Sequence, residues 1–238
     1  MRGYWSNWAG TPAPFMCFYI GRDMIIDIIK ECPHRHPNSV EESDYIDQLL
    51  CYPVYEIIGK IFSPETFLEI GTLLGGSIIS VVHGSQNVKE VAFIDTEGYI
   101  AGSNDLAKDN IKYYVSKYYK RPLCCDSYKS IEAFGSINHT QFDLMHIDGD
   151  HSYDGAMKDL EFMLRIRPKH VVVDDIIYIP AVFDAVKDFV KKRNLYWFGI
   201  RSFRGTAYIN VDENKTKEAL KLFIENGLEC FGGIVEAT

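Results

Sequence analysis

Two apolar stretches of this sequence each end in side chains that can bind a metal ion or move a proton. They are FDLMHID (142–148) and HVVVDDI (170–176), and a further acid and a histidine follow the first stretch. The side chains concerned are Asp148, Asp150, His151, Asp174 and Asp175. Parallel sheets bind ligands beyond the carboxyl ends of their strands, so these positions suit a functional site.

The carboxylates are candidates for a metal site. Neighbouring strands lie ~4.8 Å apart, so Asp148 on one strand and Asp174 and Asp175 on the next could converge on one point. Carboxylates this close repel and raise each other's pKa, and a divalent cation removes that penalty. Oxygen ligands suit Mg²⁺, or alternatively Mn²⁺ or Ca²⁺, better than Zn²⁺. We therefore predict that these three residues bind the metal.

His151 is the candidate general base, because an imidazole exchanges protons near neutral pH. Other interpretations stay open. His151 could be a metal ligand or a structural residue, and Asp174 and Asp175 could cap a helix or bind an arginine. For Asp150, and alternatively Asp154, we expect a capping role at the start of the helix that follows.

A glycine-rich turn in FLEIGTLLGGSIIS (67–80) predicts a cofactor site. Gly71 and Gly76 fit the spacing of a dinucleotide fingerprint, but Leu73 replaces the glycine that lets a pyrophosphate approach the backbone. This argues against NAD or FAD. It favours S-adenosylmethionine, whose amino acid portion carries no phosphate and can lie against the turn.

Residues around this turn provide contacts for that cofactor. The backbone amides of Gly75, Gly76 and Ser77 could bind its carboxylate, and Glu69 could hold its ammonium group. Asp95 ends the second predicted strand, at the usual place for an acid that binds two ribose hydroxyls.

Three further residues complete the predicted cofactor site. Asp126 ends the third predicted strand, where an acid can reach the adenine amino group, and Ser127 follows it. Asp148 lies at the end of the fourth predicted strand. The alternative is that strand-to-helix turns favour glycine and strand ends are polar without any ligand.

These residues must be positioned by a parallel sheet. Short apolar stretches recur from residue 66 onward and alternate with helical patterns. The predicted strands are 66–71, 90–95, 122–126, 142–148 and 170–176. The predicted helices cover about 75–83, 102–119, 127–134, 153–166 and 180–193. This alternation predicts a doubly wound α/β fold with helices on both faces of the sheet.

The C-terminal part predicts an antiparallel edge. Two stretches, 195–202 and 205–211, are separated by only a few residues and indicate a hairpin. A helix over about 213–227 follows, and the tail beyond it could add another strand. We therefore expect a mostly parallel, seven-stranded, Rossmann-like sheet that ends in an antiparallel hairpin.

Residues 1–60 differ from the regular pattern of residues 61–238, which we predict to be the cofactor-binding domain. They contain two helical patterns joined by a turn-rich segment and predict an N-terminal helical arm or lid. Aromatic residues in the arm could exclude water from the site, or could equally form a core or a subunit contact. These residues are Trp5, Trp8, Phe15, Phe18 and Tyr19.

The composition narrows the choice of partners. The chain has 238 residues, is 47% hydrophobic and carries a formal net charge of −8, so it can bury a sizeable core and is poorly suited to nucleic acid or anionic lipid. It contains no apolar run of ~18 residues, so we expect no spanning helix. Its six cysteines are scattered and form no CxxC motif. The N-terminus lacks a signal-peptide pattern, and we expect a cytoplasmic protein without a zinc site or a disulfide framework.

Four motifs together resemble class I S-adenosylmethionine-dependent methyltransferases. They are EIGTLLGGS, FDLMHIDGDHSYDGAMKDL, VVVDDI and RGTAYI. The resemblance covers about residues 60–211 and points to the metal-dependent subgroup that includes macrocin-type sugar O-methyltransferases and cephalosporin-hydroxylase-like proteins. It implies a magnesium site at Asp148, Asp174 and Asp175, a base at His151 and the methyl donor over the glycine-rich turn.

The sequence therefore predicts a Mg²⁺-assisted O-methyltransferase that acts on a small molecule such as a sugar, a natural product, or a vicinal diol or catechol. The metal would lower the pKa of the acceptor hydroxyl, His151 would take the proton, and the oxygen would attack the sulfonium methyl group in line. We expect a homo-oligomer with no nucleic acid or membrane partner. Two alternatives stay open: a methyltransferase-like fold with other metal-dependent chemistry, and a non-catalytic binding or scaffold protein.

Overall fold

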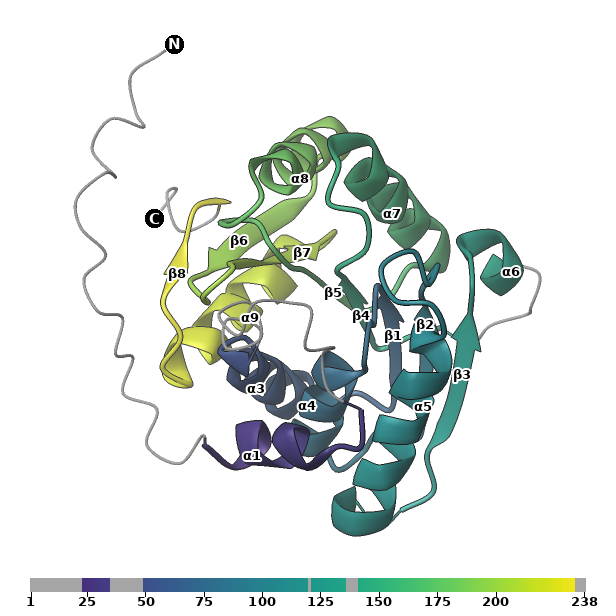
Figure 1. The fold of residues 1–238 in the computed structure, drawn as a ribbon. Coiled ribbons are helices and arrows are strands. Elements are labelled where there is room, and N and C mark those ends of the chain that lie inside the picture. Colours follow the sequence, from purple (N-terminus) through teal and green to yellow (C-terminus); the bar gives the residue numbers. More distant parts are fainter. Residues whose placement is uncertain (1–22, 35–48, 120, 136–140, 234–238) are drawn as a thin grey trace.

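The structure, a computed structural model, describes residues 23–34, 49–119, 121–135 and 141–233. Its centre is an eight-stranded sheet with the strand order β3-β2-β1-β4-β5-β7-β6-β8 (Figure 1). The strands are β1 (Thr66–Ile70), β2 (Glu90–Ile94), β3 (Cys124–Tyr128), β4 (Leu144–Ile147), β5 (His170–Val173), β6 (Tyr196–Ile200), β7 (Thr206–Asn210) and β8 (Cys230–Phe231). This architecture confirms the predicted fold class.

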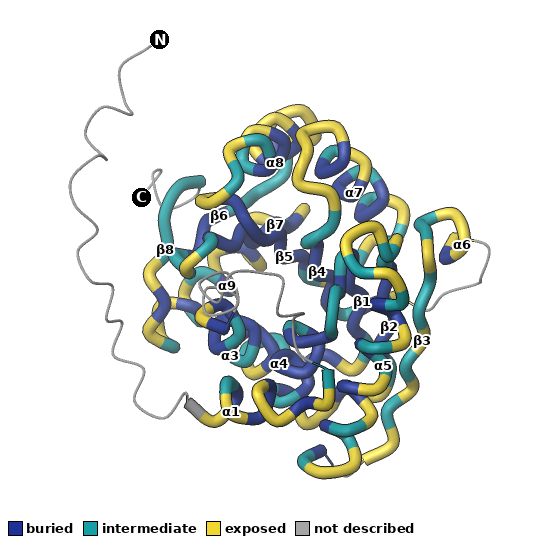
Figure 2. The backbone as a smooth tube through the Cα atoms, in the orientation of Figure 1, coloured by how far each residue is buried: buried dark blue, intermediate teal, exposed yellow. Residues whose placement is uncertain are grey.

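The strands from β3 to β5 are parallel, and their order places the glycine-rich turn next to the carboxylates. β1 lies between β2 and β4, and β4 pairs with β5. The chain therefore builds the sheet outward from β1 in both directions, which leaves a crevice beyond the carboxyl ends of β1 and β4. β4 is buried throughout and β5 is buried after its first residue (Figure 2). Burial on both faces explains why these strands read as continuous apolar runs.

The C-terminal edge of the sheet is antiparallel, as predicted. β7 pairs with both β5 and β6 in antiparallel orientation. The expected count of seven strands is one too low, because β8 pairs with Gly199 and Ile200 of β6. β8 has two residues and lies in the C-terminal tail, where the sequence allowed for another strand.

Helices cover both faces of the sheet and divide the buried side chains into two cores. The helices are α1 (Asp23–Glu31), α3 (Tyr52–Phe62), α4 (Gly76–Gly84), α5 (Ser103–Tyr114), the π-helical η1 (Val115–Tyr119), α6 (Ile131–Gly135), α7 (Tyr153–Ile166), α8 (Pro180–Arg193) and α9 (Glu213–Glu225). One core joins α1, α3, α4, α5, η1 and α9 to one face of the sheet. The other joins α6, α7 and α8 to the opposite face. Within the residues described, no helix is both long enough and apolar enough to cross a membrane.

The described part of the N-terminal arm shares a core with the sheet. α1 buries Ile25, Ile28 and Ile29 in the same core as α3 and α4. A Cβ atom added at Gly59 of α3 would lie 2.2 Å from the carbonyl oxygen of Val81 in α4, so these two helices pack closer than a larger residue permits. In its described residues, the arm is therefore part of the helical layer that packs on the sheet. The aromatic residues predicted to form a lid precede α1 and lie outside the described residues.

Candidate functional site

The glycine-rich turn between β1 and α4 is held against the end of β4. Gly71 has a φ of +80°, and a Cβ atom there would lie 1.8 Å from the carbonyl oxygen of Asp148, so only glycine fits. The N–H of Asp148 donates to the carbonyl oxygen of Ile70 at 2.8 Å. Leu73 has a φ of +48°, and its N–H donates to Oδ2 of Asp95 at 2.9 Å. These contacts fix the turn relative to the ends of β2 and β4.

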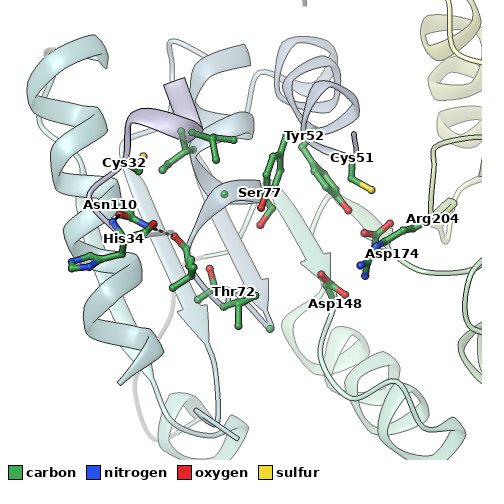
Figure 3. A pocket seen from close by; sticks show the side chains of 17 residues that line it. Cys32, His34, Cys51, Tyr52, Thr72, Ser77, Asn110, Asp148, Asp174 and Arg204 are labelled. Carbon is green, nitrogen blue, oxygen red and sulfur yellow. Dashed lines mark hydrogen bonds between the residues drawn. The ribbon is translucent and has the colours of Figure 1, made fainter. Parts of the chain in front are cut away.

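A pocket lies above this turn and is bordered by α1, α3 and α5 (Figure 3). Five of the predicted site residues line it: Gly71, Gly76, Ser77, Asp148 and Asp174. Several other lining residues were not predicted from the sequence; they include Cys51, Tyr52, Tyr55, Asn110 and Arg204. The pocket thus brings the predicted donor turn and two predicted metal ligands into one cavity.

Side chains from α3 and α5 shape the wall of the pocket over the turn. A Cβ atom added at Gly76 would lie 2.4 Å from the ring of Tyr52, so this tyrosine packs directly on the start of α4. Nδ2 of Asn110 donates to the carbonyl oxygens of His34 at 2.9 Å and Leu74 at 3.0 Å. Oδ1 of Asn110 accepts from the N–H of His34 at 2.9 Å (Figure 3). Asn110 therefore ties the chain after α1 to the turn.

A buried carboxylate–imidazole pair lies beneath the turn. Glu69 and His146 are register partners on β1 and β4, and both side chains are buried. Oε1 of Glu69 lies 2.6 Å from Nδ1 of His146 and accepts a hydrogen bond from Oγ of Ser77 at 2.5 Å. Burial alone would lower the pKa of His146, but the hydrogen bond and charge of Glu69 outweigh it and raise that pKa. Glu69, the predicted ammonium ligand, keeps its other oxygen, Oε2, without a hydrogen-bonding partner among the described residues.

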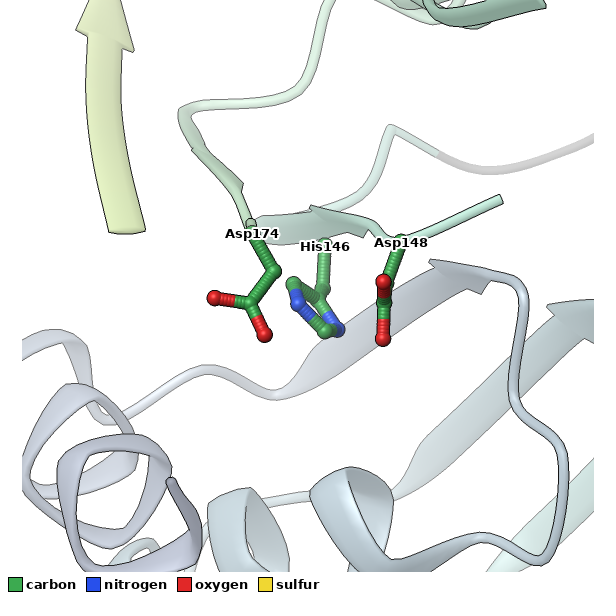
Figure 4. A group of neighbouring side chains, drawn as sticks. All are labelled: His146, Asp148 and Asp174. Carbon is green, nitrogen blue, oxygen red and sulfur yellow. The ribbon is translucent and has the colours of Figure 1, made fainter. Parts of the chain in front are cut away.

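The predicted metal ligands divide between two neighbouring groups. Asp148 and Asp174 lie with His146, and Asp148 and Asp175 lie with His151; within each group the ligand atoms are all within 4.8 Å of one another. Figure 4 shows the first group, with the ring of His146 between the two carboxylates. In the second group, Nε2 of His151 lies 3.2 Å from Oδ1 of Asp148 and 3.2 Å from Oδ2 of Asp175. The imidazole of His151 therefore bridges two carboxylates.

Burial and mutual repulsion shift the pKa values of this cluster. The pKa of Asp175 rises to about 7 because the side chain is buried and because Asp174 and Asp148 lie nearby. A guanidinium nitrogen of Arg204 lies 3.5 Å from the Asp175 carboxylate and offsets part of this repulsion. The pKa of His151 is raised, chiefly by its hydrogen bond to Asp148. The cluster holds negative charge that a cation can neutralise.

Two acids predicted to bind the cofactor differ in how they are placed. Asp95 follows β2 and accepts the hydrogen bond from Leu73, which keeps it beside the turn. The prediction that Asp126 ends the third strand is wrong, because β3 continues for two residues beyond it and Asp126 pairs in register with Ala92. Ser127 lies in the same strand. This edge strand is polar and mostly exposed or half-buried, so its sequence carries no apolar signal for where it ends.

The helix after the carboxylate motif also begins differently from the prediction. Ser152, rather than Asp150 or Asp154, is the N-cap of α7, and its Oγ accepts from the N–H of Gly155 at 3.0 Å. Oδ1 of Asp150 instead accepts from the N–H of Ser152 at 2.9 Å. Serine caps a helix about as well as aspartate, so the residue type alone did not decide between them. Together these residues hold the loop that carries His151.

His146 and Arg204 were not predicted as site residues, and they differ in whether the sequence could have revealed them. His146 precedes Asp148 by two positions, and alternate side chains of a strand share a face, so spacing alone could have placed the two side by side. Arg204 precedes β7, and it reaches Asp175 because β7 runs antiparallel to β5. That pairing comes from the tertiary fold, so no local pattern predicts it.

Comparison with known proteins identifies part of the chain. A sequence family described as a methyltransferase domain matches residues 68–176. The chain is 27% identical over 151 residues to uncharacterized protein R132 of Acanthamoeba polyphaga mimivirus, a match that spans 59% of this chain and 67% of that protein.

Solved structures of methyltransferases share the fold. An O-methyltransferase from Bacillus cereus in complex with SAH aligns with a TM-score of 0.57 and 16% identity, over 82% of this chain and 94% of that one. The SAH-bound methyltransferase PaMTH1 of Podospora anserina aligns with a TM-score of 0.55 and 15% identity, over 86% of this chain and 100% of that one. At these identities, the likeness establishes the common architecture.

Proposed function

We propose that the chain transfers a methyl group from S-adenosylmethionine to a hydroxyl group of a small molecule, with the help of a divalent cation. The match of residues 68–176 to a methyltransferase domain family supports this proposal. The observation that carries this proposal is that the glycine-rich turn and the carboxylates of Asp148 and Asp174 line one pocket. Methyl transfer needs the donor and the acceptor oxygen held in line at about 3–3.5 Å. A single pocket that binds both can achieve this.

The proposed donor site is the turn from Gly71 to Ser77. α4 begins at Gly76, and the first N–H groups of a helix have no intrahelical acceptor, so they can bind the carboxylate of the donor. Glu69 lies beneath Ser77, and its unpartnered Oε2 supports the proposed contact with the donor ammonium group. Asp95, fixed beside the turn, is the proposed ribose ligand.

The residues at the ends of β4 and β5 fit a divalent cation. Asp148 and Asp174 line the pocket, and Asp175 lies beside them with a pKa that burial and these two neighbours raise to about 7. A set of hard carboxylate oxygens with this much repulsion is suited to Mg²⁺ or Mn²⁺. When bound, the ion polarises the acceptor hydroxyl and fixes its position.

His151 is the proposed proton acceptor. Neither its ring nor that of His146 lines the pocket, but the side chain of His151 is 43% exposed and contacts Asp148, which does line it, whereas the side chain of His146 is 1% exposed. Of these two histidines, His151 is therefore the one that a bound acceptor could approach. Asp148 and Asp175 lie on either side of the His151 ring and hold its orientation. The same carboxylates stabilise the imidazolium that forms when His151 takes the hydroxyl proton.

The lining of the pocket favours an acceptor with an apolar or ring-shaped body and a polar end. Ile29, Tyr52 and Tyr55 give the pocket an apolar and aromatic lining, and Asp148 and Asp174 add two carboxylates to it. Tyrosine rings pack well on the faces of sugar and aromatic rings. A sugar, a natural product, or a vicinal diol or catechol meets both requirements.

The test is a methyl-transfer assay with S-adenosylmethionine carrying a labelled methyl group. Purified protein is incubated with separate panels of catechols, glycosides and simple diols, with Mg²⁺, with Mn²⁺ or with a chelator. We expect label in one panel, at a rate that falls when the chelator is present. A folded protein that binds the donor but labels no panel would instead support a non-catalytic member of the fold or one with other metal-dependent chemistry.

A further inference from the structure

His146 is a buried histidine with one ring nitrogen engaged and one left over. It lies in β4, two residues before Asp148, and its side chain is 1% exposed. Nδ1 lies 2.6 Å from Oε1 of Glu69, on the neighbouring strand β1. Nε2 has no hydrogen-bonding partner within the part of the chain that the structure describes.

The unpartnered Nε2 is unfavourable in either protonation state. If Nε2 carries a proton, a buried donor lacks an acceptor, and if it does not, a buried acceptor lacks a donor. Native proteins pair such atoms, so this one points to a ligand. A metal ion satisfies a nitrogen lone pair without needing a proton.

Two carboxylates lie where such an ion would be shared. A ring nitrogen of His146 and one oxygen each of Asp148 and Asp174 lie within 4.8 Å of one another (Figure 4). Three ligands about 2.1 Å from one ion lie roughly 3–3.6 Å from one another, so the three groups would have to approach one another by at most about 1–2 Å. The strands β4 and β5 are hydrogen-bonded neighbours, which holds these side chains in register.

Glu69 occupies the position of a supporting residue for a metal-binding histidine. Such histidines donate their second ring N–H to a carboxylate or carbonyl, which fixes the tautomer and the ring orientation. The contact from Glu69 to Nδ1 leaves Nε2 as the nitrogen available to an ion. Ser77 also donates to Oε1 of Glu69, so the support of this ring is connected to the turn proposed to bind the methyl donor.

The negative charge of Asp175 is already balanced by neighbouring side chains outside the group around His146. Asp175 lies 3.5 Å from Arg204 and 3.2 Å from His151, and it belongs to the second group of side chains rather than to the group around His146. Apart from Glu69, which contacts Nδ1, the carboxylates grouped with His146 are those of Asp148 and Asp174. Of the two groups, the one better suited to bind the ion is therefore the one that contains the imidazole nitrogen of His146.

We propose that Nε2 of His146 is a metal ligand, together with Asp148 and Asp174, and that the ion is a divalent transition metal such as Mn²⁺, Fe²⁺ or Co²⁺ rather than Mg²⁺. Imidazole nitrogen suits these ions, whereas Mg²⁺ prefers oxygen ligands only. Glu69 is the positioning residue for His146. The inference rests on the proposed function only in taking the pocket to bind a metal ion.

The test uses Mn²⁺ and the full-length chain, because Mn²⁺ binding is observed by electron paramagnetic resonance without any turnover. The metal-free protein is titrated with Mn²⁺, and the electron spin echo of the bound ion is examined for modulation by a directly coordinated nitrogen. We expect one bound Mn²⁺ with nitrogen modulation and displacement only by a large excess of Mg²⁺.

Substitutions show which side chain supplies the nitrogen that coordinates Mn²⁺. His146→Gln should lose the modulation and bind Mn²⁺ at least about tenfold more weakly. His151→Ala, which removes the other imidazole near Asp148, should keep the modulation. Glu69→Gln should keep the modulation but weaken binding roughly 10- to 100-fold, and it serves as the second variant if His146→Gln does not fold.

Three results would overturn the inference: bound Mn²⁺ without nitrogen modulation, modulation that disappears in His151→Ala and survives in His146→Gln, or no Mn²⁺ binding at all. These failures are distinct from failure of the proposed function. Methyl transfer that persists in a chelator would leave that function intact without a metal. Nitrogen-coordinated Mn²⁺ without any methyl transfer would leave the metal site intact and remove the function.

Discussion

Glu69 and His146 face each other across β1 and β4, with Oε1 of Glu69 2.6 Å from Nδ1 of His146 and both side chains at most 1% exposed. An ionised carboxylate is tolerated at such a depth only with a charged or strongly donating partner. The pair lies directly beneath Ser77 and beside the carboxylates of the pocket. It therefore connects the stability of the central sheet to the geometry of the site.

Removing either partner of this pair should destabilise the fold. We expect Glu69→Gln and His146→Phe each to lower the free energy of unfolding by about 3 kcal/mol, because each leaves an uncompensated buried group. The double variant should lose at least about 1 kcal/mol less than the sum of the two. Urea unfolding of all four proteins measures this. Strict additivity would show that the two side chains are not coupled.

Gly71 should be irreplaceable for two separable reasons, its backbone conformation and the approach of Asp148. Both reasons apply to the variant Gly71→Ala, because φ is +80° and the new Cβ would lie 1.8 Å from the carbonyl oxygen of Asp148. Gly227→Ala is a matched control, since Gly227 has a φ of +81° with no atom within 4 Å of the added Cβ. We expect the control to lose about 1–2 kcal/mol of unfolding free energy.

Gly71→Ala should lose clearly more than the control and should no longer bind the methyl donor. Thermal and urea unfolding of both variants give the comparison, followed by titration with S-adenosylmethionine. Equal losses in the two variants would mean that the turn can move away from Asp148 and that the close approach is not required.

His151→Ala should lower turnover by about 10²- to 10⁴-fold if this residue accepts the proton. Binding of S-adenosylmethionine should be unchanged, because His151 does not line the donor turn. Asp150→Asn is the control, since this neighbouring acid is exposed and accepts from Ser152 within the same loop. A His151→Ala variant that keeps full turnover would assign proton removal to another group or to solvent.

His170 should make the fold less stable in acid. Its ring stacks on Phe62 at 4.1 Å and contacts the hydroxyl of Tyr208 at 2.9 Å, and burial lowers its pKa to about 4. The unfolded chain takes up this proton near pH 6.5, so between pH 6.5 and pH 4 it binds more protons than the folded chain. Stability therefore falls as the pH falls through this range, by about 1–3 kcal/mol for this residue.

Unfolding free energies measured at pH 7, 5.5 and 4.5 test this. His170→Gln should show a shallower loss of stability with falling pH than the unmodified chain, whatever its stability at pH 7. Parallel curves for the two proteins would show that His170 titrates normally in the folded state.

The sheet and the methyltransferase assignment could be predicted from sequence because their signals are local and repeated. β4 and β5 are buried on both faces and read as apolar runs, and the glycine-rich turn follows β1 directly. The family match over residues 68–176 confirms this part of the prediction. The end of β3 was misplaced by two residues, because an exposed edge strand has no apolar pattern to mark its limit.

The partners within the site were harder to predict, because they depend on register between strands. Glu69 and His146 are 77 positions apart in the chain and meet only because β1 and β4 pair with these residues opposite each other. The sequence placed Asp148, Asp174 and Asp175 at one edge but could not show that His151 and Arg204 compensate Asp175. Side-chain direction at a strand end decides such contacts, and it follows from tertiary packing.

Calorimetric titration of the purified chain with S-adenosylmethionine tests the central claim most directly, with NAD as a matched control ligand. We expect saturable one-site binding of S-adenosylmethionine and no binding of NAD, because Leu73 stands where a pyrophosphate would need glycine. A folded protein that does not bind S-adenosylmethionine, with or without a divalent cation, would show that the glycine-rich turn is not a site for this methyl donor.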